Sequence, residues 1–264
     1  YFGGQVQRKV DEARNRVAAL LGALPEEIIF TACGTESDNA AIRSALEVFP
    51  ERRHIITTRV EHPAVLTLCR NLSKRGYRVT ELGVDGEGRL DLNELRSVID
   101  EDTAVISVKW ANNETGVIFP VEEISRIVKE QGAAALFHTD AVQAVGKIPI
   151  NMATSSIDML SISGHKLHAP KGTGVLYLRK GVPFRPFMVG GHQEHSRRAG
   201  TENTAGIIAL GKACELAGHW MEDENTRVKA LRDRLEAALL ELIPRARING
   251  GEAERLPNTL SIAF

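Results

Sequence analysis

The segment Ser161-Ile-Ser-Gly-His-Lys166-Leu-His-Ala-Pro-Lys-Gly-Thr-Gly174 combines an apolar strand, a lysine and a glycine-rich turn. The strand ends in small residues, presents Lys166, and turns through Pro170 into a second strand. A charged lysine at the end of a buried strand costs free energy unless it is paired or used chemically. A single lysine in such a place is more often a surface residue. The functional interpretation is a lysine that forms a Schiff base with pyridoxal phosphate.

Around this segment, short apolar runs alternate with helical patterns. Strands that alternate with helices at this spacing indicate right-handed crossovers and a mostly parallel sheet. The sequence therefore predicts an α/β fold, with a mostly parallel seven-stranded sheet between helices. The expected strands are 27–31, 54–58, 78–83, 103–110, 133–139, 158–163 and 174–178, and the expected helices are 5–24, 35–49, 64–76, 92–99 and 120–131.

The carboxyl-terminal third has a different pattern. Residues 182–204 lack periodicity, and an irregular loop of this length is more often functional than idle. Residues 205–242 predict a long, broken helix, and 258–264 resemble a strand. We expect a large cofactor-binding domain over 1–222 and the incomplete beginning of a small α+β domain over 223–264. The start at Tyr1 and the end inside a strand-like run predict that the parent protein continues at both ends.

Composition excludes several classes of protein. The 264 residues carry a formal net charge of -1, from 33 basic and 34 acidic side chains. A nucleic-acid binder would need a basic excess to displace counterions, and no apolar run approaches the roughly 20 residues of a membrane span. The three widely spaced cysteines form neither a disulfide framework nor a zinc site. They fit a reducing compartment, so we expect a cytoplasmic protein without nucleic-acid, membrane or metal binding.

A Schiff-base cofactor of this kind needs a carboxylate that keeps its pyridine nitrogen protonated. The run Phe137-His-Thr-Asp140-Ala-Val-Gln143 supplies one at a strand's carboxyl end, where ligands gather in open α/β sheets. Gln143 could reach the phenolic oxygen of the ring from the same side. Taken alone, Asp140 could equally be a helix N-cap.

The phosphate of the cofactor needs hydrogen-bond donors. Phe30-Thr-Ala-Cys-Gly34-Thr35-Glu-Ser37 reads as strand, glycine turn and helix start, and free N–H groups at a helix start favour an anion. Thr35 and Ser37 are also candidate N-caps. Ser163 and His165, beside the lysine, could add donors. Alone, this turn is a weak signal, because many α/β proteins have one.

Two further motifs follow strands. His62, in Glu61-His-Pro63, could stack on the cofactor ring and transfer protons, although a single histidine is more often a loop residue. Asn113, in the polar loop 112–116, could be only a turn residue. The loop segments 190–194 and 197–203 could be mobile and basic. Since all these segments meet one cofactor's requirements, coincidence is a poor explanation for them.

Together these motifs resemble the fold-type I pyridoxal-phosphate enzymes, within them the class V cysteine desulfurases, and among those the nitrogen-fixation (NifS-type) branch. The resemblance covers essentially the whole chain. It rests on Cys33-Gly-Thr-Glu-Ser-Asp-Asn39, Glu61-His-Pro-Ala-Val65, Ala111-Asn-Asn-Glu-Thr-Gly116, His138-Thr-Asp-Ala-Val-Gln143, Ser163-Gly-His-Lys-Leu-His-Ala-Pro-Lys-Gly172 and Arg198-Ala-Gly-Thr-Glu-Asn203.

The resemblance implies a role for each matching residue. Lys166 would hold the cofactor and, with His62, act in catalysis. A homodimer would be the functional unit, because Thr201 would reach the phosphate bound by the other subunit. The cofactor-binding set would be Gly34, Thr35, His62, Asn113, Asp140, Gln143, Ser163, His165, Lys166 and Thr201.

The family reaction converts L-cysteine to L-alanine, and the sulfur passes as a persulfide to an iron–sulfur scaffold protein. The implied role is in cluster assembly, with nitrogenase maturation as the expected destination. The family's persulfide cysteine and its substrate-carboxylate arginine lie in segments beyond Phe264, and no local cysteine matches that motif. Cys33 is expected to be a small core residue rather than a nucleophile, and Cys69 and Cys214 are expected in the core.

Two alternatives remain open. One is another class V enzyme, namely a selenocysteine lyase, a sulfinate desulfinase or an aminotransferase. The other is a non-catalytic, truncated homologue that binds cofactor and partners only. The pattern around Gln143, Leu167-His168 and Arg198–Asn203 favours the desulfurase.

Overall fold

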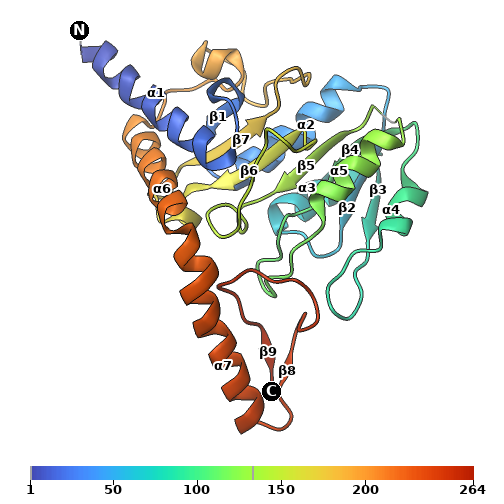
Figure 1. The fold of residues 1–264 in the computed structure, drawn as a ribbon. Coiled ribbons are helices and arrows are strands. Elements are labelled where there is room, and N and C mark those ends of the chain that lie inside the picture. Colours follow the sequence, from blue (N-terminus) through green and yellow to red (C-terminus); the bar gives the residue numbers. More distant parts are fainter. Residues whose placement is uncertain (1, 133) are drawn as a thin grey trace.

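The structure is a computed structural model that describes residues 2–132 and 134–264. Within the described residues, seven strands form one sheet in the order β1-β7-β6-β5-β4-β2-β3 (Figure 1). The strands are β1 (Ile28–Thr31), β2 (His54–Thr58), β3 (Arg78–Leu82), β4 (Thr103–Ser107), β5 (Leu136–Asp140), β6 (Met159–Ser163) and β7 (Gly174–Leu178). The predicted α/β fold and its seven-stranded sheet are confirmed. The first residue of the strand expected at 133–139 lies outside the described residues.

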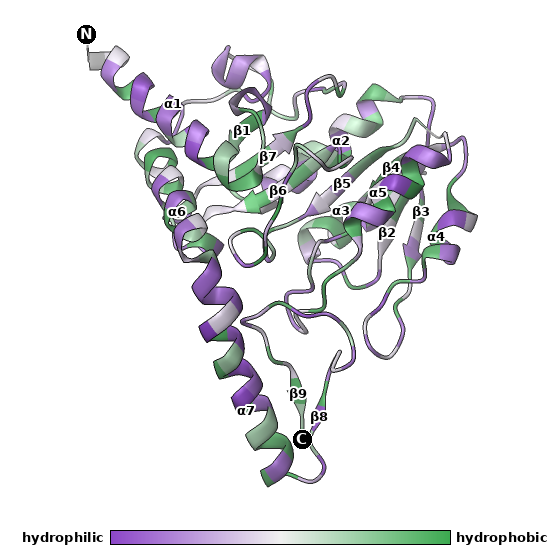
Figure 2. Cartoon of the chain, in the orientation of Figure 1, coloured by the Kyte–Doolittle hydropathy of each residue, from purple (hydrophilic) through white to green (hydrophobic). Residues whose placement is uncertain are grey.

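Helices cover both faces of the sheet. Apolar residues of α2 and α3 pack with one set of sheet side chains, while α1, α4, α5 and α6 pack with the other set. The strands in Figure 2 carry both apolar and polar colours, and every strand except β3, at the edge of the sheet, is buried along its whole length within this sheet. The helices are α1 (Phe2–Leu21), α2 (Gly34–Val48), α3 (Pro63–Ser73), α4 (Leu92–Val98), α5 (Val121–Glu130), α6 (Thr204–Asp223) and α7 (Lys229–Leu242). No described helix is long and apolar enough to cross a membrane.

Strand direction brings the sequence motifs to one edge of the sheet. The strands β2, β3, β4, β5 and β6 run parallel, and β7 is antiparallel to both β6 and β1. Because β7 is antiparallel to both β1 and β6, β1 runs in the same direction as β6. The motifs that follow β1, β2, β4, β5 and β6 therefore meet at the edge of the sheet where β7 begins. In the register of the sheet, Gly174 lies opposite both Thr31 and Ser163. This arrangement places the glycine turn after β1 next to the lysine turn after β6.

The carboxyl-terminal segment differs in detail from the prediction. The long helix expected to be broken is helical throughout residues 204–242, because a π-helical turn, Glu224–Val228, joins α6 to α7. Beyond α7, which extends away from the sheet (Figure 1), only Arg247–Ile248 (β8) and Ile262–Ala263 (β9) pair as strands. Leucines on α7 are exposed, among them Leu235 and Leu242.

Three local predictions were wrong. Thr35 and Ser37 are not N-caps, because α2 already begins at Gly34 with Cys33 in the capping position. The apolar run 103–110 is a strand only to Ser107, after which the chain turns into the cavity described below. The helix expected over 5–24 ends at Leu21, and Gly22 after it adopts a left-handed φ of 60°.

Candidate active site

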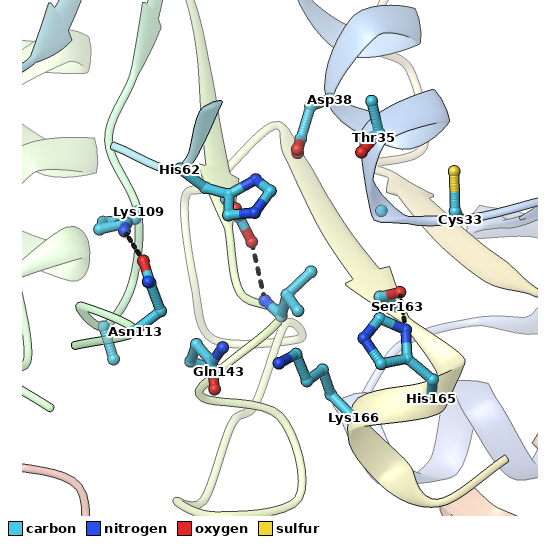
Figure 3. A pocket seen from close by; sticks show the side chains of 14 residues that line it. Cys33, Thr35, Asp38, His62, Lys109, Asn113, Gln143, Ser163, His165 and Lys166 are labelled. Atoms are coloured by element: carbon cyan, nitrogen blue, oxygen red, sulfur yellow. Dashed lines mark hydrogen bonds between the residues drawn. The ribbon is translucent and has the colours of Figure 1, made fainter. Parts of the chain in front are cut away.

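A cavity of about 280 Å³ lies at the carboxyl edge of the sheet (Figure 3). Nine of the ten predicted site residues line it, from the exits of β1, β2, β4, β5 and β6. These nine are Gly34, Thr35, His62, Asn113, Asp140, Gln143, Ser163, His165 and Lys166. Thr201, the tenth, is exposed and does not line the cavity of this chain.

Lys166 enters the cavity from a single 3₁₀ turn, Gly164–Leu167, that directly follows β6. In Figure 3 its side chain extends toward Gln143. The turn ends at His168, whose left-handed φ of 63° reverses the chain toward β7. Leu167 is buried while Lys166 is exposed to the cavity, so the packing of one neighbour directs the amine of the other.

Asp140 is the last residue of β5 and is almost fully buried. Its Oδ1 accepts a hydrogen bond from the Val142 N–H at 2.9 Å. Burial raises the pKa of the Asp140 carboxyl, and the hydrogen bond from Val142 and the positive charge of Lys109 oppose that rise. The helix N-cap alternative was wrong, because residues 142–147 form turns rather than a helix.

His62 is the N-cap of α3 as well as a cavity residue. The Ala64 N–H donates to His62 Nδ1 at 3.2 Å, and Pro63 occupies the first helical position. A ring nitrogen that accepts a hydrogen bond carries no proton, so this contact places the imidazole proton on Nε2. The capping contact thus fixes both the tautomer and the orientation of the ring.

The predicted phosphate cradle forms where α2 starts beside the exit of β6. The first turn of a helix leaves backbone N–H groups without intrahelical partners. A Cβ added at Gly34 would lie 3.0 Å from Val142 Cγ2 and 3.3 Å from Ser163 Cβ, so glycine lets the helix start approach the exit of β6 this closely. Ser163 Oγ and His165 Nδ1 are 2.9 Å apart, and burial lowers the pKa of His165 with help from Lys166 and Lys171.

The sequence analysis missed two charged cavity residues. Asp38 lies one turn along α2 from Gly34, and its Oδ1 is buried without a hydrogen-bond partner, 3.5 Å from His138 Nε2. Burial and the charge of Asp140 hold the pKa of the Asp38 carboxyl well above its usual range. The second residue, Lys109, follows β4 and is 1% exposed. Its signal in the sequence was a lysine inside an apolar run.

Glu61 lies behind the cavity and connects two strand exits. Its Oε1 accepts hydrogen bonds from the Thr58 hydroxyl at 2.8 Å and from the Lys109 N–H at 2.9 Å. Its Oε2 is buried without a partner. Burial raises the pKa of Glu61 to about 7, although the charge of Lys109 opposes the rise.

The predicted core positions of two cysteines are confirmed, since Cys69 and Cys214 are fully buried. Burial raises the pKa of both thiols to about 12, which keeps them from forming thiolates near neutral pH. Cys33 differs from this expectation in part, because it is only half-buried and borders the cavity.

The donor set fits pyridoxal phosphate in three respects. Gly34 brings a helix start with free N–H groups to the cavity, next to the two side-chain donors Ser163 and His165. Asp140 provides a buried carboxylate for a protonated ring nitrogen. A primary amine, Lys166, and an imidazole, His62, line the space between them. The fold and this cavity define an α/β enzyme of the class that holds its cofactor through a lysine Schiff base.

Comparison with known proteins identifies the family. The aminotransferase class-V family, which depends on pyridoxal phosphate, matches residues 1–264, and the chain belongs to it. The chain is 60% identical to a cysteine desulfurase of Trichormus azollae and 59% identical to the cysteine desulfurase NifS of Azotobacter vinelandii. Each match covers all of this chain and 65% of the relative, so the chain spans about two thirds of the length of these proteins.

A solved structure described as a NifS-like protein shares the fold, with a TM-score of 0.95 and 42% identity. That similarity covers 100% of this chain and 72% of the other. The predicted family, fold type and cofactor are confirmed.

Proposed function

We propose that the protein is a cysteine desulfurase that converts L-cysteine to L-alanine and passes the sulfur on as a persulfide. The observation that carries this proposal is the meeting of nine predicted residues in one cavity, in a chain 59–60% identical to cysteine desulfurases. We expect the persulfide to serve iron–sulfur cluster assembly on a scaffold protein, with nitrogenase maturation as the destination.

Bound pyridoxal phosphate supplies an electron sink and an aldehyde for the Schiff base. In the proposal, the Asp140 carboxylate holds the proton on the ring nitrogen, and Gln143 donates to the phenolic oxygen. The first turn of α2, Ser163 and His165 hold the phosphate, and Asn113 lies beside the ring. Each of these groups lines the cavity, which supports its assignment.

Protons move through two side chains in this proposal. Lys166 Nζ would hold the cofactor through the Schiff base and, as the free amine, would carry the proton of the substrate α-carbon. His62, with its proton on Nε2, stacks on the ring and assists the transfer. A thiolate would then attack the substrate sulfur, and the carbon–sulfur bond would break as the sulfur–sulfur bond forms. The electron pair of the broken bond would stay on the substrate β-carbon, which takes up a proton to give alanine.

The accepting thiolate is assigned to a cysteine outside this sequence. Cys69 and Cys214 are buried with raised pKa values, and Cys33 lies at the cradle for the phosphate rather than beside Lys166 in Figure 3. The arginine that binds the substrate carboxylate is likewise assigned beyond Phe264. The length of the relatives supports both assignments.

The remaining parts of the proposal concern assembly. Residues 1–222 form the large domain, and 223–264 begin a small domain, which the exposed leucines of α7 support because a following segment can cover them. Thr201 binds the phosphate of the second subunit in a homodimer, consistent with its position outside the cavity of its own chain. The protein works in the cytoplasm.

Substrate assays separate the proposal from its alternatives. The cofactor-loaded parent protein is incubated in turn with L-cysteine, L-selenocysteine, L-cysteine sulfinate and an amino acid with a keto acid. Two results together support the desulfurase. L-cysteine gives alanine and sulfide that a reductant releases, and kcat/KM is higher for L-cysteine than for the other three substrates or substrate combinations. A selenocysteine lyase, a desulfinase or an aminotransferase would prefer its own substrate, and a non-catalytic homologue would turn over none.

A further inference from the structure

Lys109 is a second buried lysine at the cavity. It follows β4 by two residues, is 1% exposed and lines the same space as Lys166. Its ammonium donates to Asn113 Oδ1 at 2.7 Å, as Figure 3 shows. Its own backbone N–H donates to Glu61. The side chain is therefore held at both ends inside the protein.

The chemistry of this contact fixes the orientation of the Asn113 amide. An ammonium has three donors and no acceptor, so only the amide oxygen can face it. The amide NH₂ must then point away from Lys109. Since hydrogen bonds from charged donors are about twice as strong as neutral ones, this orientation is well held.

The surrounding charge keeps the lysine in place. Burial lowers the pKa of Lys109, whereas the carboxylates of Glu61, Asp140 and, on the neighbouring helix, Asp38 raise it. Glu114, also near, acts in the same direction. The cation thus stands among carboxylates, two of which have a buried oxygen without a hydrogen-bond partner.

We propose that Lys109 is a positioning residue of the cofactor site: it holds the Asn113 amide with its NH₂ as a preset donor for an anionic oxygen of the bound ligand. Without the ammonium, the amide can rotate and present its own oxygen to that anion. The role is exerted through Asn113 and not by contact of Lys109 with the reacting atoms. The inference rests on the cofactor site proposed above, but not on the identity of the substrate.

The test is a double-mutant cycle on cofactor binding. Pyridoxal phosphate is titrated into the apoprotein of the wild type, Lys109→Met, Asn113→Ala and the double variant. Each single change is expected to weaken binding roughly tenfold, the loss that corresponds to one charged hydrogen bond. Both changes remove the same donor. The affinity of the double variant for pyridoxal phosphate is therefore expected to be at most about threefold lower than that of the single variant with the lower affinity.

A spectroscopic readout separates positioning from a structural role. The absorption spectrum of the bound cofactor is expected to change in the same direction in Lys109→Met and Asn113→Ala, because both changes remove the same oriented donor. Removing a buried cation from among carboxylates lowers stability by itself, so affinity and spectrum are measured at a temperature at which the apoprotein of every variant is folded. Lys147→Met is the matched control, since Lys147 is a partly buried, ion-paired lysine outside this cavity.

Three results would overturn the inference. They are unchanged cofactor affinity in Lys109→Met, losses that multiply in the double variant, and a cofactor spectrum that stays as in the wild type in Lys109→Met while it changes in Asn113→Ala. Trapping the cofactor on Lys166 with borohydride is the separate check of the site. If trapping succeeds and the cycle is additive, only the role of Lys109 fails.

Discussion

The Glu61 carboxylate accepts a hydrogen bond from the Lys109 backbone N–H at 2.9 Å, which joins the exit of β2 to the exit of β4 directly behind the cavity. The two residues are also close enough for the charge of Lys109 to lower the pKa of Glu61. Burial is nevertheless the larger effect on this carboxyl group. Glu61 should therefore make stability depend on pH.

The first prediction concerns Glu61→Gln. The pKa of Glu61 rises from 4.5 to about 7 on folding, so between these values the folded state binds a proton that the unfolded state has lost. Stability then falls as pH rises through this window, by up to about 3 kcal/mol. The variant lacks this titration. The free energy of unfolding is measured in urea for both proteins. The value for Glu61→Gln minus the value for the wild type should be larger at pH 8 than at pH 5. An equal difference at both pH values would contradict the account.

The second prediction concerns the buried ion pair between Arg14 and Glu194. Two hydrogen bonds, 2.7 and 2.8 Å long, join the side chains, and Glu194 also accepts from the Phe30 N–H. Because Glu194→Ala leaves a buried arginine without its partner, we expect a loss of about 3–5 kcal/mol in the free energy of unfolding. Glu12→Ala, which removes an exposed partner of Arg16, should cost less than about 1 kcal/mol. Similar losses for both variants would show that the buried Arg14–Glu194 pair contributes no more to the free energy of unfolding than an exposed pair does.

The third prediction concerns Asp140→Asn. The amide can still accept the Val142 N–H but lacks the negative charge that holds the ring proton. We expect pyridoxal phosphate to remain bound and alanine formation per bound cofactor to fall about 100-fold or more. Asp91→Asn is the control, because Asp91 is an exposed helix cap of α4. Wild-type turnover in Asp140→Asn would remove this carboxylate from the proposed mechanism.

The fourth prediction concerns Gly34→Ala. The added methyl group would lie 3.0 Å from Val142 Cγ2 and 3.3 Å from Ser163 Cβ, so it would force apart the helix start and the exit of β6 that form the proposed phosphate cradle. We expect at least roughly tenfold weaker binding of pyridoxal phosphate, the lower end of the cost of overpacking. Affinity for pyridoxal, which lacks the phosphate, should change little. Gly218→Ala, where a Cβ would make an ordinary 3.6 Å contact, is the matched control. Equal losses for both ligands would place the phosphate elsewhere.

Much of the fold was predictable because its signals are local. Apolar runs of strand length and helical periodicity located the seven strands and the helices of the large domain. Helix starts were predicted less well, since Thr35 and Ser37 looked like caps while the chain enters α2 one residue before Thr35. The π-helical turn at Glu224–Val228 has no comparable sequence signal. For this reason the sequence pattern predicts a broken helix where the structure has a continuous one.

The candidate site divides in a similar way. Lys166, Asp140 and His62 stand at strand exits or helix starts, where sequence patterns point to chemistry. The sequence analysis did not predict Asp38 or Lys109 as site residues. Both are buried beside the cavity only because the tertiary fold brings α2 and the exit of β4 together there. Thr201 lies outside the cavity, so its assignment depends on a second subunit and stays a prediction.

The central claim is that Lys166 carries the cofactor, and trapping with borohydride tests it most directly. The protein is loaded with pyridoxal phosphate, reduced, digested and analysed by mass spectrometry, with Lys166→Ala treated in parallel. The account predicts a reduced pyridoxal-phosphate adduct on the peptide that contains Lys166, and its loss in the variant. An adduct on Lys109, the other lysine that lines the cavity, or no adduct at all, would contradict it.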